Sequence, residues 1–89
     1  MEFNKEKILK KKTVIKCKDF EEWDEVIEEF QLKNVLKYED LMINYDCIDV
    51  LADNYDHSKH YEYCNYNILT FEEATRKPKK KKRKKNFIG

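Results

Sequence analysis

The stretch from residue 19 to residue 30 constrains the fold of this chain more than any other. Its large apolar residues recur every three or four positions: Phe20, Trp23, Val26, Ile27 and Phe30. On an α-helix this spacing gathers the side chains into one apolar stripe. Asp19 precedes the stretch and Glu22 lies three positions later, the arrangement of a capping box with aspartate as the N-cap. The sequence therefore predicts an amphipathic helix that begins after Asp19 and runs to about Leu32.

The segment before this helix predicts a strand. Residues 13–18 are rich in β-branched side chains, and alternation places Thr13, Ile15 and Cys17 on one face. The lysine-rich residues 5–12 form a lead-in with one helical turn.

A hairpin is predicted further along the chain. Residues 46–52 are typical of a second strand and residues 55–63 of its return strand. Asp53 and Asn54 would form a two-residue turn between them, because both residue types tolerate positive φ. In an extended return strand, Tyr61 and Tyr63 would share one face.

Shorter signals complete the fold. Asn34 is a candidate left-handed cap for the helix, and residues 38–42 indicate a short helical turn or a tight excursion. Residues 68–69 predict a short extended piece, and Thr70 with Glu73 forms a second capping box that opens a terminal helical turn. In this order the elements predict an α+β fold, a small antiparallel sheet of about three strands packed on one amphipathic helix.

The charges divide into three blocks along the 89 residues. Residues 1–18 carry seven Lys and two Glu, residues 19–75 carry sixteen acids and three Lys, and residues 76–85 carry nine Lys or Arg. The net charges of the blocks are +5, −13 and +9. We expect a compact domain over residues 1–75 and a lysine-rich tail over residues 76–89. Nine like charges repel one another and bury nothing, so we expect the tail to be disordered when free.

The predicted helix is acidic on the side away from its apolar stripe. Several of its carboxylates stand four residues apart, and each such pair of like charges costs about 0.2–0.5 kcal/mol. One interpretation is an anionic surface that competes with nucleic acid for a basic groove of a partner. The other is an ordinary solvated face. The candidate partner-binding residues are Glu21, Asp24, Glu25, Glu28 and Glu29.

The tail is the candidate nucleic-acid contact. A run of cations binds RNA or DNA phosphate by releasing counterions, without sequence preference. Two alternatives remain open: the tail shields the acidic block of its own chain or mediates self-association, or it acts as an import or other targeting signal. The candidate contact residues are Lys77, Lys79, Lys80, Lys81, Lys82, Arg83, Lys84 and Lys85.

Metal binding and catalysis have little basis in the sequence. His57, His60 and Cys64 are ligand types that suit zinc, but a structural zinc site needs four ligands, and Lys59 between the histidines opposes a cation. No Gly-rich phosphate-binding loop is present, since the single Gly is Gly89. We therefore expect neither a cofactor nor an enzyme. The three cysteines indicate reduced thiols, and we expect a cytoplasmic protein that does not enter a membrane.

The layout resembles small proteins of phages and mobile elements from low-GC bacteria. The resemblance rests on a short strand that enters a Phe- and Trp-rich acidic helix and on the closing residues 68–73. It implies a small stoichiometric inhibitor of the anti-CRISPR or host-takeover kind. The expected partner is a host or defence-system protein, as part of a nucleoprotein complex. The alternative function is a general RNA- or DNA-binding accessory protein, associated with a ribosome or a virion, that uses the basic tail.

Overall fold

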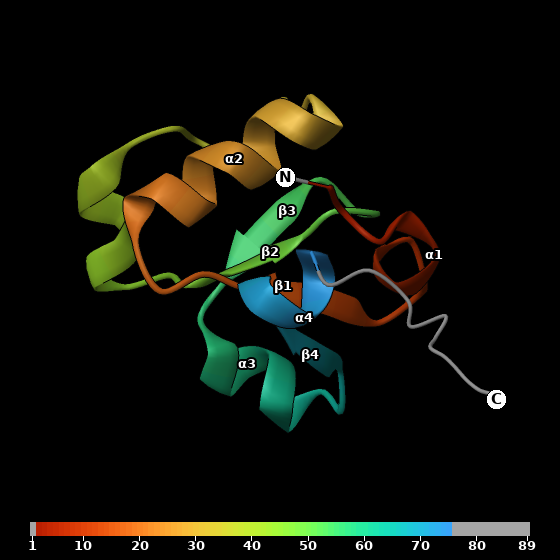
Figure 1. The fold of residues 1–89 in the computed structure, drawn as a ribbon. Helices are drawn as coiled ribbons and strands as arrows, with labels where there is room; N and C mark the ends of the chain where they lie inside the picture. Colours follow the sequence, from red (N-terminus) through yellow and green to blue (C-terminus); the bar gives the residue numbers. More distant parts are fainter. Residues whose placement is uncertain (1, 76–89) are drawn as a thin grey trace, which may run out of the picture.

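The fold is a four-stranded mixed sheet with helices on both faces (Figure 1). The computed structural model describes residues 2–75, so residue 1 and the tail lie outside it. The strand order is β3-β2-β1-β4. The elements are α1 (Lys5–Ile8), β1 (Thr13–Lys16), α2 (Phe20–Phe30), a 3-10 helix η1 (Glu39–Ile43), β2 (Cys47–Asp49), β3 (Asn54–Asp56), α3 (Ser58–Tyr63), β4 (Asn67–Thr70) and α4 (Phe71–Thr75).

The predicted α+β class is confirmed, with two differences in the sheet. The sheet has four strands rather than three, and it is mixed rather than antiparallel. β1 pairs antiparallel with β2 and parallel with β4, and the parallel register matches Thr13 with Asn67 and Lys16 with Thr70. The predicted extended piece at residues 68–69 is therefore the centre of an edge strand.

The central strand β1 is buried on both faces. Val14 and Ile15 are each fully buried, although adjacent residues of a strand point to opposite sides. The predicted alternation is confirmed, because Ile15 and Cys17 belong to one apolar cluster and Val14 to another. The strand ends at Lys16 rather than Lys18.

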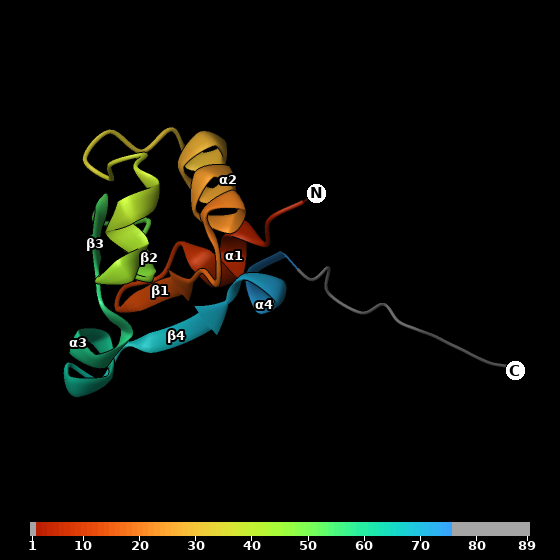
Figure 2. The same cartoon turned by 90° about the vertical axis from the view of Figure 1, so that its left-hand side faces the viewer.

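The larger cluster lies between the sheet and α2, on the side where η1 also packs (Figure 2). Trp23 is its largest fully buried side chain. The Nε1–H of Trp23 donates a hydrogen bond to the backbone oxygen of Leu36 at 2.9 Å, and its ring meets that of Tyr55 edge-on at 5.7 Å. The smaller cluster, on the α3 side of the sheet, contains Val14, Cys47 and Tyr61.

Helix α2 ends at Phe30, two residues before the predicted position. Gln31 adopts the left-handed conformation, with φ of 51°, so the predicted left-handed cap at Asn34 is wrong. The amides of Lys33 and Asn34 instead donate to the two carboxylate oxygens of Asp53, at 3.1 and 3.0 Å. These bonds fix the chain beyond the helix end.

The β2–β3 connection is longer than predicted. It occupies residues 50–53, because β2 already ends at Asp49 and Asn54 begins β3. The Asp49 carboxylate accepts the Ala52 amide at 3.1 Å, and the Asp53 amide donates to the Val50 oxygen at 3.2 Å. Asp53 has φ of 55°, so the expected use of Asp at a positive-φ position is confirmed while the two-residue turn is wrong.

The predicted return strand is wrong beyond Asp56, where α3 begins instead. The Nδ1 atom of His57 accepts the Lys59 amide at 3.0 Å as the helix N-cap. The first amide of the helix, that of Ser58, donates to the Asp46 carboxylate at 2.8 Å. On a helix Tyr61 and Tyr63 no longer share a face. Tyr61 is buried, whereas Tyr63 is 88% exposed.

The predicted helical turn of the lead-in is confirmed, and of the two alternatives for residues 38–42 the helical turn is the one observed. Residues 5–8 form the turn of the lysine-rich lead-in, with Ile8 buried against the larger cluster. Residues 39–43 form the 3-10 turn η1. In the described part of the chain, no helix combines the length and the apolar character needed to cross a bilayer.

Candidate binding surfaces

The acidic face of α2 is partly neutralised by a lysine from the following loop. Lys37 Nζ lies 3.2 Å from Asp24 Oδ1 and also contacts Glu28 Oε2. The hydrogen bond to Glu28, followed by the one to Asp24, raises the pKa of Lys37. Asp24 and Glu28 stand four residues apart, and their mutual repulsion is offset by the ammonium group between them. Asp24 and Glu28 are therefore not a destabilising pair of like charges in the folded domain.

The other acids of the face differ in their contacts. Glu29 pairs with Lys5 of α1 at 3.6 Å. Glu21 and Glu25 are exposed, and their carboxylates form neither an ion pair nor a hydrogen bond with another group of residues 2–75. The uncompensated charge of the predicted surface is thus concentrated on Glu21 and Glu25, which lie on adjacent turns of α2.

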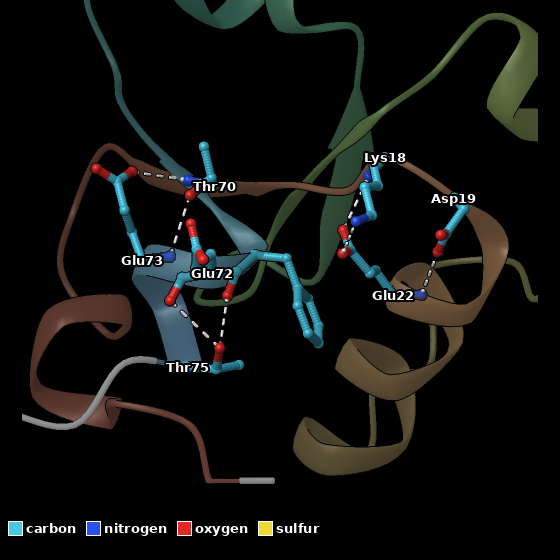
Figure 3. A network of polar contacts seen from close by, with 8 residues as sticks. Lys18, Asp19, Glu22, Thr70, Glu72, Glu73 and Thr75 are labelled. Carbon is cyan, nitrogen blue, oxygen red and sulfur yellow. Dashed lines mark hydrogen bonds and ion pairs between the residues drawn. The ribbon is translucent and has the colours of Figure 1, made fainter.

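The two capping boxes lie side by side, as Figure 3 shows. Asp19 Oδ1 accepts the Glu22 amide at 3.0 Å, and Thr70 Oγ1 accepts the Glu73 amide at 3.0 Å. Glu73 reaches back to the Thr70 amide at 2.9 Å, which confirms the second box. In the first box Glu22 reaches one residue further, to the Lys18 amide at 2.9 Å. The boxes meet because β1 and β4 are parallel, so α2 and α4 begin at the same end of the sheet.

A groove of about 560 Å³ runs between the two boxes. Four charged residues line it. Lys16 ends β1 and Lys18 lies just beyond it, while Glu22 belongs to α2 and Glu72 to α4. The capped amides at its end already bond to side chains of the boxes, so they are not available to an anion. The groove therefore presents charges of both signs. Sequence reasoning missed it because the boxes stand far apart along the chain and only the parallel pairing joins them.

Removing the Asp19 cap tests the energetic weight of the first box. We expect Asp19→Ala to lower the free energy of unfolding by about 1 kcal/mol, because the Glu22 amide loses its acceptor. Asp40→Ala is the matched control, since Asp40 is an exposed acid in η1 whose carboxylate accepts no hydrogen bond within residues 2–75. Urea unfolding of both variants measures the difference. Equal losses in the two variants would show that the effect is one of net charge and not of capping.

The three candidate metal ligands of α3 do not converge. His57 uses Nδ1 to cap the helix. His60 Nε2 lies 3.9 Å from Cys64 Sγ and 3.8 Å from an oxygen of Asp56. Within residues 2–75, no three His, Cys, Asp or Glu side chains form a group that could hold a metal ion. His60 therefore makes polar contacts with Asp56, which precedes α3, and with Cys64, which follows it.

The three cysteines are free thiols in different surroundings. Cys17 and Cys47 are buried in the two apolar clusters, and Cys64 is half-buried. Burial, and secondarily the charge of Glu22, raises the pKa of the Cys17 thiol. Burial, and secondarily the charge of Asp46, raises the pKa of Cys47 to about 12. A thiol with a raised pKa is a poor nucleophile at neutral pH, so these two cysteines act as core residues.

The predicted nucleic-acid contacts in the tail lie outside the described residues. Three comparisons of the chain with known proteins gave no match. No protein-family model, no curated protein and no solved structure matches the chain.

Proposed function

We propose that this protein is a non-enzymatic inhibitor of the phage type, which binds a nucleic-acid-handling machine in the cytoplasm of a bacterial host. The acidic surface of α2 would occupy a basic groove of the partner, while the basic tail contacts nearby RNA or DNA. The observation that carries the proposal is the segregation of charge, −13 over residues 19–75 followed by +9 over residues 76–85. Such asymmetry favours a partner that itself displays both signs, as a nucleoprotein does.

The contacts of α2 support the acidic half of this proposal. Glu21 and Glu25 keep their charges exposed and unpaired among residues 2–75. Residues four apart on a helix have Cβ atoms about 5–6 Å apart, a spacing that a phosphate-binding groove could accept. Lys37 holds Asp24 and Glu28 beside them, so these two carboxylates form an ordered flank of the same surface.

The acidic surface is tested by reversing its two unpaired charges. We expect Glu21→Lys with Glu25→Lys to weaken capture of the partner from a host lysate by on the order of tenfold or more, because like charges would then face the basic groove. The matched control is Glu39→Lys with Asp40→Lys, which changes the net charge equally on exposed residues of η1. Equal capture by both double variants would rule out a specific role for α2.

The tail is tested by deletion of residues 76–89 and by nuclease treatment of the lysate. Binding should then depend less on salt, because nine cations are removed. For single strands, the slope of the logarithm of the binding constant against the logarithm of the salt concentration should become shallower by up to about 6. Unchanged affinity with an unchanged slope would refute the two-part arrangement. Capture of nucleic acid alone, lost after nuclease and insensitive to the reversal at Glu21 and Glu25, would favour the general RNA- or DNA-binding function instead.

A further inference from the structure

A cluster of lysines before β1 has no role in the proposed function. Residues 10–12, here called the lysine turn, join α1 to β1, and Lys7 lies on the adjacent helix α1. All four lysines of this cluster are exposed, and none forms an ion pair with a carboxylate of residues 2–75. An acid-rich block follows in the sequence, but none of its carboxylates forms an ion pair with these lysines.

The backbone of the lysine turn is held in a defined conformation. Lys12 has φ of 59°, a left-handed geometry that Asn or Gly adopts more readily than Lys. Its backbone oxygen accepts the Asn67 amide of β4 at 2.7 Å, and the Lys10 amide donates to the Ile8 oxygen at 2.8 Å. The sheet therefore maintains a strained residue that presents adjacent lysines at the surface. Such strain concentrates at functional positions.

An aromatic side chain and a shallow groove lie beside these charges. Lys12 Nζ lies 5.8 Å from the centre of the Tyr66 ring. Lys11, Lys12 and Tyr66 line a groove of about 300 Å³, whose apolar wall includes the half-exposed Leu51. Asp49 also borders the groove, but it is buried and its carboxylate accepts the Ala52 amide. The exposed charge at the groove is therefore positive.

We propose that the lysine turn and the Tyr66 groove form a binding site for single-stranded nucleic acid. Lysines at the rim would contact successive phosphates, and the groove would receive a base against Tyr66 and Leu51. Proteins that bind single strands combine cations, which contact the phosphates, with aromatic side chains, which stack on the bases. The bases of a duplex stack on one another and are not available to enter such a groove. This site involves neither the acidic surface of α2 nor the tail, so it is independent of the proposed function.

The test uses the full chain and single strands of about 12 nucleotides, oligo(U) and oligo(dT). Amide resonances are followed by NMR during titration, which separates the folded site from the tail. The site variant is Lys11→Gln with Lys12→Asn, because Asn keeps the left-handed geometry of residue 12. The matched control is Lys33→Gln with Lys59→Gln, which removes two other exposed and unpaired lysines.

We expect the resonances of residues 10–12 and 66–67 to shift with the single strands. We also expect the site variant to reduce the slope of the logarithm of the binding constant against the logarithm of the salt concentration by about 1.4, because it loses two phosphate contacts worth about 0.7 each. The control variant should keep the slope of the parent. Shifts confined to residues 76–89, or equal slope losses in both variants, would overturn the proposal. An equal response to a duplex of the same length, or a stronger response to poly-glutamate, would also overturn it. None of these outcomes bears on capture of the partner by α2.

Discussion

Replacing Trp23 with alanine is expected to lower the free energy of unfolding by about 3–5 kcal/mol, the range for a large aromatic side chain removed from a core. Trp23 has no exposed surface, and it joins α2 to two other parts of the fold. Its ring contacts Tyr55 of β3, and its indole N–H bonds to the Leu36 oxygen in the loop after the helix. The alanine variant loses all of these contacts and leaves a cavity.

The loss is large relative to the total stability of such a domain. At about 0.05–0.15 kcal/mol per residue, the 74 described residues correspond to roughly 4–11 kcal/mol. The alanine variant should therefore lose at least about a quarter of the stability of the domain and unfold at a clearly lower urea concentration than the parent. Tyr63→Ala is the control, because Tyr63 is 88% exposed and its loss should change stability by less than about 0.5 kcal/mol. A Trp23→Ala variant that kept the parent midpoint would contradict the central position given to this side chain.

The second large effect is expected in alkaline solution. Unfolded thiols ionise near a pKa of 9.0, whereas in the folded domain burial raises the pKa of Cys47 to about 12. The folded state therefore holds this proton more tightly, and the resulting stability is complete below pH 9 and lost as the pH rises toward 12. At about 1.4 kcal/mol per pKa unit, Cys47 alone accounts for about 4 kcal/mol by pH 12. Burial raises the pKa values of Cys17 and Tyr61 as well, which adds losses of the same sign.

Cysteine variants separate this effect from general alkaline damage. We expect Cys17→Ala with Cys47→Ala to be less stable at neutral pH because it removes buried sulfur atoms, but to lose less stability between about pH 8 and pH 11. Cys64→Ala, at a half-buried thiol, should keep the steep profile of the parent. The measurement is the free energy of unfolding from urea titrations at each pH under reducing conditions. A parent protein whose stability stayed constant up to pH 11 would contradict the burial of these two thiols.

The features predicted correctly from the sequence are the ones decided by neighbouring residues. The start of α2 follows from Asp19 and Glu22, and the start of α4 from Thr70 and Glu73, in each case through bonds between residues three or four apart. The buried face of α2 follows from helical spacing. Local chemistry is sufficient for such predictions.

The incorrect predictions concern segments whose structure depends on distant partners. The residues of α3 alternate in a way that suits a strand, yet Asp46 and the N-cap His57 bind the first amides of a helix. The parallel pairing of β4 with β1 has no signal in either segment alone. For the same reason the sequence identified the five candidate acids of α2 but not the counterions of three of them, because Lys37 and Lys5 reach α2 only through the tertiary fold.

The position of β1 in the sheet has a consequence for how the protein is made. β1 is synthesised well before β4, one of its two neighbours in the sheet, because residues 17–66 separate the two strands. Pairing of this kind requires closure of a long loop, which slows folding relative to local pairing. A chain that ends before β4 would leave the apolar β1 with an open edge, a site for pairing with other chains. We therefore expect nascent chains that end before residue 67 to aggregate, and the domain to fold cooperatively only after β4 has been synthesised.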